Sequence, residues 1–594
     1  MRRSVTFIAV LVLAVLSLSG VLAACGGPPP IQGPAPTPIP SLIPVVQATA
    51  TVAPARPAGP GPQAAQPRGP ARRPAADTTL ASFTTADFSG AGLCAACHIG
   101  LKDGAGTDVS MPTAWRSTMM ANAGKDPIWQ AKVSSEVARF PALQAVIEKK
   151  CVTCHMPMAE TQAVAEGKPV TALGDGFYNP ANPLHAAAID GVSCTLCHQI
   201  RDKDFGKPAS FSGGYFVDTG TNPPDRPIFG PYEQPVAQIM QASTGFVPVY
   251  GAHMESAEHC ATCHNLYTPY VDAQGNVLGE FPEQTPYTEW QHSSFGAART
   301  SCQSCHMPQA QGGVVISTVP ANLAPRQPFY QHFFVGGNAF MLQILADWGG
   351  ELEVTADATH FATTQARVAD QIGKRSATLT LKGLELKDGV LRAQLQVSPL
   401  TGHKFPASFP SRRAWLHVTV TDAAGGVIFE SGKHNPDGTI AGNDADADPG
   451  KFEPHYDVIT AADQVQIYEP IMGDNEGAVT YTLLRGARYL KDNRLLPAGA
   501  DKAALPADIA VYGEAAGDAN FVGGGDLVTY QVDVKGATGP FTVNAELLYE
   551  PLSYRFVQDL LRDKTPLVER FGGYYAATDK TPLRVAAIEP AQSR

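Results

Sequence analysis

Cys194-Thr195-Leu196-Cys197-His198 is one of five Cys-x-x-Cys-His segments that decide how this chain folds. The other four are Cys94-Ala95-Ala96-Cys97-His98, Cys151-Val152-Thr153-Cys154-His155, Cys260-Ala261-Thr262-Cys263-His264 and Cys302-Gln303-Ser304-Cys305-His306. Each is the attachment signature of a c-type haem, in which two thiols bind the porphyrin and the following histidine ligates the iron. Zinc sites and disulfide frameworks also use paired cysteines, but neither requires a histidine directly after every pair. The sequence therefore predicts five covalently bound haem c groups, each with a proximal histidine.

The first 25 residues have the pattern of a lipoprotein signal peptide. Arg2 and Arg3 precede an apolar run, and Leu22-Ala23-Ala24-Cys25 matches a bacterial lipobox. An ordinary secretory signal and an uncleaved helix are the alternatives, although the apolar run is short for a membrane span. We expect lipid on Cys25, which would hold the protein at the extracytoplasmic face of a bacterial membrane, at the cell surface or in the periplasm. Residues 26–78 are rich in proline and alanine and predict a disordered tether.

The charge of the chain indicates what it can bind. The formal net charge is -11 before any cofactor is added. An acidic field disfavours nucleic acid and suits cationic or small soluble redox partners. We therefore expect redox partner proteins, contact with a membrane through the lipid anchor, and no nucleic acid.

Residues 79–350 hold all five motifs and predict a domain of short helices and loops around the haems. A second strong ligand on each iron makes an electron carrier, whereas an open position makes a catalyst. The candidate distal ligands are His185, His253, His332, His403 and Met120. His259 and His292 are weaker alternatives, and Met111 and Met119 compete with Met120 for the first haem. Five candidates match five irons, which favours a carrier.

The chain after the motifs changes its hydrophobic period to two. Alternating apolar residues occur at 391–397, 416–420, 528–534 and 541–547, and Asp388-Gly389 is a hairpin turn signal. We expect a connecting helix at 351–374, an antiparallel β-sandwich at 375–550, and a C-terminal helix and tail at 551–594. The predicted fold class is therefore α+β and multidomain, with a mainly helical multihaem domain followed by the sandwich.

One acidic segment of the second domain resembles a metal-binding loop. Asp444, Asp446 and Asp448 have the spacing that opens a calcium loop, but the twelfth position is His455 instead of glutamate. We therefore expect a solvated acidic turn. No nucleophile with a base partner, phosphate loop or nucleotide fingerprint stands out, so no catalytic residues are predicted.

Several segments resemble bacterial multihaem cytochromes of the cytochrome c-552/4 type. They are Asp190-Gly191-Val192-Ser193-Cys194, Tyr287-Thr288-Glu289-Trp290, Cys302-Gln303-Ser304-Cys305-His306-Met307-Pro308, Gly402-His403-Lys404-Phe405-Pro406, Tyr489-Leu490-Lys491-Asp492-Asn493-Arg494-Leu495-Leu496-Pro497 and Leu547-Leu548-Tyr549-Glu550-Pro551-Leu552. The resemblance covers most of residues 90–560. That group is related to the nitrifiers' tetrahaem carrier and, more distantly, to hydroxylamine oxidoreductase and pentahaem nitrite reductase.

The resemblance implies a mostly bis-histidine haem array that passes electrons outside the cytoplasmic membrane, with His185, His332 and His403 as distal ligands. The tetrahaem relatives have a histidine where this chain has Met120, which leaves the ligand of the first haem open. The Cys-x-x-Cys-Lys motif of the nitrite reductases is absent, and this chain has five motifs where the oxidoreductase carries eight haems. We expect an electron carrier; the alternative is an oxidoreductase with one open haem that acts on nitrite, hydroxylamine or a similar small nitrogen or sulfur compound.

Overall fold

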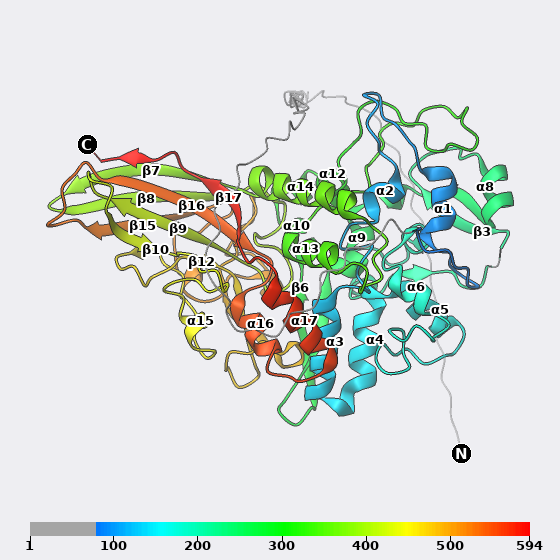
Figure 1. Cartoon of the computed structure of the whole chain (residues 1–594), viewed down its shortest axis with the longest axis horizontal. Helices are drawn as coiled ribbons and strands as arrows, with labels where there is room; N and C mark the ends of the chain where they lie inside the picture. The colour runs from blue at the N-terminus through cyan, green and yellow to red at the C-terminus, as the bar shows by residue number, and fades with distance from the viewer. Residues whose placement is uncertain (1–78, 222, 594) are drawn as a thin grey trace, which may run out of the picture. The chain divides into compact units, whose positions relative to one another are not determined.

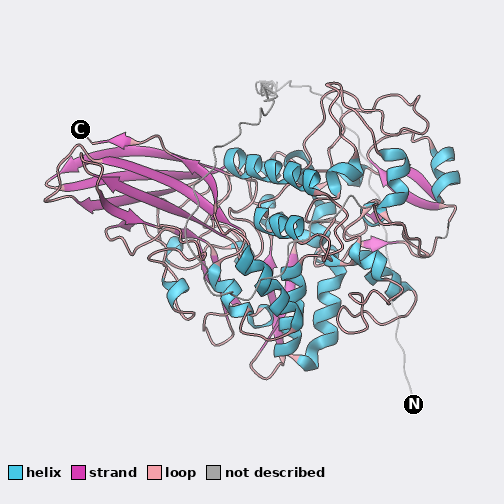
Figure 2. Ribbon diagram, in the orientation of Figure 1, coloured by secondary structure: helices cyan, strands magenta, loops and turns pink. Residues whose placement is uncertain are grey.

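The computed structural model describes residues 79–221 and 223–593, which form a mixed α+β structure with several separate sheets (Figures 1 and 2). The predicted signal peptide, Cys25 and the predicted tether lie outside the described residues. Within the described part, no helix combines the length and apolar character that a membrane span needs.

Short helices and two-stranded sheets make up the part of the chain that carries the motifs. The motif-bearing helices are α1 (Ala91–His98), α4 (Gln144–His155), α7 (Cys194–Cys197), α9 (Ala257–His264) and α12 (Cys302–His306). Between them lie α2 (Met111–Trp115), α3 (Pro127–Arg139), α5 (Pro157–Ala165), α6 (His185–Ile189), α8 (Ala237–Thr244), α10 (Pro286–Gln291) and α11 (Ser294–Ala297). The small sheets pair β1 (Ile200–Arg201) with β2 (Phe216–Val217), β3 (Arg226–Gly230) with β4 (Phe246–Tyr250), and β5 (Leu266–Val271) with β6 (Val277–Gln284).

Local sequence signals explain where the longest of these helices begins. The Asp126 side chain accepts a hydrogen bond from Ile128 N, and Pro127 occupies the first turn of α3, where its missing N–H costs nothing. Helices α13 (Ala339–Asp347) and α14 (Ala358–Arg375) follow the last motif. The Asp357 side chain caps α14 in the same way, by accepting from His360 N. Helix α14 lies where the sequence predicts the connecting helix.

Two larger sheets follow α14. One has the order β11-β15-β8-β7, built from β7 (Ala377–Lys387), β8 (Val390–Pro399), β11 (Val458–Ile459) and β15 (Asp526–Asp533). The other has the order β10-β9-β16-β17, built from β9 (Arg413–Thr421), β10 (Val427–Ser431), β16 (Thr542–Glu550) and β17 (Leu583–Ala587), with β12 (Ile467–Tyr468) and β18 (Ala591–Gln592) at its sides. Short β13 (Pro470–Gly473) pairs with β14 (Arg488–Asp492). All these pairs are antiparallel except β11 with β15.

The alternating pattern places one face of each strand in the core. Leu391, Leu395 and Val528 from one sheet and Val418 and Leu547 from the other are buried in a single apolar cluster. Helices α13 and α14 contribute to the same cluster. The hairpin between β7 and β8 turns at 388–389 with both residues at positive φ, as its Asp-Gly sequence predicts. The sheets and helices therefore share one core.

The C-terminal segment is more ordered than the predicted helix and tail. Helix α16 (Tyr554–Leu560) is followed by α17 (Pro566–Ala577), and then β17 and β18 pair with β16. Buried side chains of α17, Phe571 and Tyr574 among them, join the main core. The end of the chain is therefore part of the sheet and its packing.

The acidic segment 444–448 also differs from the expectation. It forms a short helix, α15 (Asp444–Ala447), in which the Asp446 side chain is 4% exposed and pairs with Arg413 at 3.1 Å. Asp444 and Asp448 are exposed, as expected of a solvated turn. The prediction was wrong for Asp446, because its ion-pair partner is distant in the sequence.

Candidate haem centres

Each of the five motifs lies at the C-terminal end of a helix. Helices α1, α4, α9 and α12 end at the motif histidine, and α7 ends one residue before it. Residues three apart share one face of a helix, so the two thiols of each motif point to the same side. The described geometry of the motifs is therefore what attachment of one porphyrin to each of them requires.

Four proximal histidines use one ring nitrogen to bind a backbone carbonyl. The Nδ1 atoms of His98, His155, His198 and His306 lie 2.7, 3.3, 2.6 and 2.5 Å from the carbonyl oxygens of Ile316, Ala123, Phe229 and Val335. Such a bond places the proton on Nδ1 and leaves the Nε2 lone pair available for a metal. These histidines are thus held in the tautomer that ligates iron.

His264 differs from the other four. Burial lowers the pKa of His264 to about 4, although much of its side-chain surface is not covered by other residues. Among the residues that the structure describes, His264 has no backbone hydrogen bond of the kind that the other four rings make, so its tautomer is not set in the same way.

His332 faces the proximal His198. Their ring centroids are 6.3 Å apart with planes 15° from parallel, and His332 Nδ1 lies 3.2 Å from Tyr330 O. Two imidazoles on opposite sides of one metal ion, each about 2 Å from it, have centroids roughly 6 Å apart. Burial and the nearby His198 lower the pKa of His332 to about 3, so the ring is neutral, as a metal ligand must be. The pair fits bis-histidine ligation of the third haem.

His403 faces the proximal His306 in the same way. Their centroids are 6.2 Å apart with planes 16° from parallel. The Nδ1 atom of His403 lies 2.9 Å from Lys404 O, so Nε2 is again the free nitrogen. The structure therefore brings a residue from the loop between β8 and β9 to the fifth motif.

His185 has a different partner. Its Nε2 lies 3.2 Å from Glu353 Oε2, and its Nδ1 lies 2.8 Å from Phe177 O. The hydrogen bond to Glu353 raises the pKa of His185, which favours the protonated ring, and a protonated Nε2 cannot ligate iron. Its assignment as a distal ligand stays a prediction.

His253 and its neighbours also lack the facing arrangement. His253 Nε2 lies 2.9 Å from Ile200 O. The His253 ring is 6.3 Å from that of His259, which is not the histidine of any motif. His292 is exposed and bonds Thr288 O through Nδ1. Within 79–221 and 223–593, no second histidine ring pairs with His98, His155 or His264 as His332 and His403 pair with theirs.

The methionines near the first motif separate into two kinds. Met111 packs in a small cluster with Leu101 and Val109, and Met119 packs against the main core. Met120 is half-buried, and its carbonyl accepts a hydrogen bond from Val192 N. Met120 therefore stays the methionine candidate for the first haem.

Thiols of different motifs lie close together. The pairs are Cys94 with Cys194, Cys154 with Cys263, and Cys260 with Cys302. The first motif is thus beside the third, and the fourth is beside both the second and the fifth. Neighbours in space are therefore not always neighbours in sequence, because helices from distant segments bring the motifs together.

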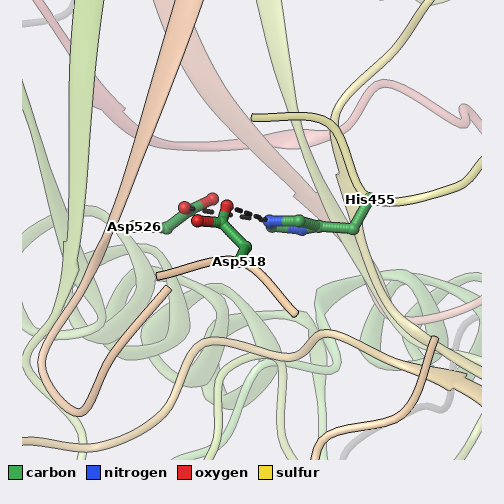
Figure 3. A group of neighbouring side chains, drawn as sticks. All are labelled: His455, Asp518 and Asp526. Atoms are coloured by element: carbon green, nitrogen blue, oxygen red, sulfur yellow. Dashed lines mark hydrogen bonds and ion pairs between the residues drawn. The ribbon is translucent and has the colours of Figure 1, made fainter. Parts of the chain in front are cut away.

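The structure also groups one histidine and two aspartates, which are residue types that ligate metals, and the sequence did not predict this cluster. His455 Nε2 is 3.1 Å from Asp518 Oδ2 and 3.9 Å from Asp526 Oδ1, and Figure 3 shows both carboxylates directed at the ring. Burial raises the pKa of Asp526 to about 7 and lowers that of His455 to about 4.

Hydrogen bonds on the other side of the His455 ring decide its tautomer. Its Nδ1 is 2.8 Å from Gln466 Nε2 and 3.1 Å from Asn493 Nδ2. The oxygens of these two amides accept from backbone N–H groups, so their nitrogens are correctly placed and both donate to Nδ1. Nε2 therefore carries the proton and donates to Asp518. The cluster is a buried hydrogen-bonded network, and its tautomer is the wrong one for a metal ligand.

Comparison with known proteins gave one structural likeness. No family model and no curated protein matched the chain. A penta-heme cytochrome c552 from Thermochromatium tepidum is similar in structure, with a TM-score of 0.44 and 16% sequence identity. The match covers 84% of this chain and 98% of that one.

Proposed function

We propose that this protein is a multihaem c-type cytochrome that carries electrons among five covalently attached haems. The observation that carries the proposal is the pair of facing rings, His198 with His332 and His306 with His403. In both pairs each ring has a free Nε2. Two such nitrogens are the axial donors that a six-coordinate haem iron needs. Bound haem would supply reversible one-electron chemistry, with a potential that its axial ligands tune.

Contacts between motifs support transfer of electrons from one site to the next. Three thiol pairs join the first motif to the third and the fourth to the second and fifth. Burial and the nearby Cys263 of the fourth motif raise the pKa of Cys197 of the third. All five attachment sites are therefore linked through close neighbours, as a carrier requires.

The remaining parts of the proposal concern location and partners. Lipid on Cys25 would hold the protein at the extracytoplasmic face, and the tether at 26–78 would let it reach redox partner proteins. The two larger sheets would act as a sandwich that covers one side of the haem-binding part and supplies His403. Mass spectrometry of the purified, membrane-extracted protein tests the lipid, because an acylated Cys25 must be the first residue of the mature chain.

The test of the carrier function counts haems and their open positions in one sample. Pyridine haemochrome analysis of the full-length holoprotein should give five haem c per chain. EPR of the oxidised protein should then show low-spin iron only, and carbon monoxide should not bind the reduced protein. Fewer than five haems would contradict the assignment of the motifs.

A second function has an observation of its own. Across residues 79–221 and 223–593, His98, His155 and His264 have no facing histidine of the kind seen at the other two motifs. An iron with an open position favours an oxidoreductase for a small nitrogen or sulfur compound such as nitrite or hydroxylamine. High-spin iron that binds carbon monoxide, together with turnover of one of these substrates, would replace the carrier proposal with this one.

A further inference from the structure

The loop that carries His403 is clamped by a segment far along the chain. Phe405 and Leu495 exchange two backbone hydrogen bonds, of 3.0 and 2.8 Å. On the other side, a Cβ on Gly402 would lie 3.1 Å from Phe295 of α11, so the loop packs closely on the helices that precede the fifth motif. The position of His403 is therefore set by two separate parts of the protein.

Glu289 joins these two parts. It lies in α10, is 2% exposed, and accepts a hydrogen bond of 3.0 Å from Lys404 N through Oε2. Its Oε1 lies 3.1 Å from Arg494 Nη2. One carboxylate from the haem-binding part thus holds both the peptide next to His403 and a cation from the second part.

The rest of the network is buried and balanced in charge. Arg494 binds Asp492 through two bonds of 2.8 Å, and Lys404 Nζ lies 2.7 Å from Asp492 Oδ2. Each of these side chains is 1 or 2% exposed. Although burial alone would raise the pKa of Asp492, the charges of Arg494 and Lys404 hold it below its usual range. Two cations and two anions therefore fix one arrangement, since any unpaired member would be costly in this interior.

The network reaches the His403 ring through a single residue, Lys404. His403 Nδ1 donates to Lys404 O at 2.9 Å, and the N–H of Lys404 is the group that Glu289 holds. Rotation of this residue would turn the imidazole away from His306. Glu289 touches neither ring and acts only through Lys404.

We propose that Glu289 is a positioning residue that keeps His403 opposite His306 and so sets whether the fifth haem is six-coordinate. The inference rests on the proposed function, because it assumes that His403 ligates that haem. It assigns a specific task to a buried carboxylate that has no contact with the haem ligands themselves. This role needs the side-chain oxygen that accepts from Lys404 N, so glutamine at position 289 should keep His403 largely in place.

The experiment compares holoprotein variants by carbon monoxide binding and EPR. Glu289→Ala should add up to one carbon monoxide-binding, high-spin haem per chain over the wild-type value. Glu289→Gln keeps an acceptor for Lys404 N but loses the anion beside Arg494, and should stay closer to the wild-type value than Glu289→Ala does. Glu453→Ala is the matched control, because Glu453 is also 2% exposed and accepts from Val465 N, but lies apart from the His403 loop.

The outcomes separate this inference from the proposed function. His403→Ala should itself add one carbon monoxide-binding haem, and a failure to do so overturns the ligand assignment. If His403→Ala has this effect while Glu289→Ala does not, the positioning role is wrong and the ligand role stands. If Glu453→Ala gives the same signal as Glu289→Ala, general loosening of the fold explains both and the inference fails.

Discussion

Replacement of His332 by alanine is the most direct test of the geometry at the third motif. The His332 ring faces His198 at 6.3 Å, and its Nδ1 bonds Tyr330 O. Among residues 79–221 and 223–593, no competing hydrogen bond holds its Nε2. Truncation at Cβ removes this ligand and leaves the backbone of the 330–334 segment intact. The expected result is one iron that loses its sixth ligand in an otherwise complete holoprotein.

The size of the effect follows from the number of motifs. Five motifs would hold five irons, so high-spin iron should rise by one fifth of the total and carbon monoxide binding by one per chain. His332→Met offers a thioether instead of an imidazole and should keep the haem low-spin while its potential rises. For a one-electron couple, each tenfold gain in preference for the ferrous state is about 59 mV.

The assay is a carbon monoxide titration of the reduced protein, with EPR of the oxidised form and a haem count on the same sample. His292→Ala is the control, because the His292 side chain is exposed and bonds the nearby Thr288 O of α10. Carbon monoxide binding that stays at the wild-type value in His332→Ala, with five haems still attached, would refute ligation by His332. The near-parallel rings at 6.3 Å would then be a packing contact only.

Three further predictions concern the buried polar groups. Asp492→Asn should lower the free energy of unfolding by about 3–5 kcal/mol, because it leaves the paired cation of Lys404 buried without its anion; a loss below about 1 kcal/mol in urea unfolding would contradict this. Asp526 has its pKa raised to about 7, so its protonated form stabilises the fold below pH 4 and this stability is lost as the pH rises to 7. Asp526→Asn should therefore be as stable as wild type near pH 4 and more stable above pH 7, by on the order of 4 kcal/mol. A difference in unfolding free energy between the two proteins that does not change with pH would contradict the raised pKa of Asp526. Zinc should not raise the melting temperature, because His455 carries its proton on Nε2; a stoichiometric zinc ion that disappears in His455→Gln would show that the tautomer is wrong.

The motifs could be predicted from sequence because they are local. Two thiols and a histidine within five residues need only one helical turn to face the same porphyrin, and the structure gives each motif that turn. The facing histidines are a long-range property. His332 follows its partner by more than a hundred residues, and the loop between β8 and β9 brings in His403, so neither spacing nor composition defines the pair.

His185 shows the limit of prediction from local context. It lies in a short segment before a motif, as a distal ligand could, but the structure places the Glu353 carboxylate at its Nε2. A partner so distant in the sequence gives no local signal. The same reason explains Asp446, which reads as solvated until Arg413 is placed beside it.

The β-rich half follows its sequence pattern more closely, with one exception. Residues 391–397 and 541–547 alternate and form β8 and β16 with their apolar faces buried, because a period of two puts alternate side chains on one face. The sequence does not predict the strand β17. It has five residues and one fully buried side chain, Val585, so its sequence shows no clear alternation of apolar and polar residues. Pairing with β16 determines that strand.

Contacts between the two halves explain why the haem-binding part needs the rest of the chain. Arg139 of α3 pairs at 2.8 Å with both Asp559 and Asp563, which flank the end of α16. Lys132 donates to Tyr481 O at 2.8 Å. Each of these contacts gives a buried or half-buried charge of α3 a partner from beyond residue 480. A chain that ends before the sheets would leave Arg139 without these two anions and Lys132 with Glu136 of its own helix. Helix α3 packs in turn on α4, the helix of the second motif, so loss of the second half would disturb a haem attachment site that lies entirely in the first.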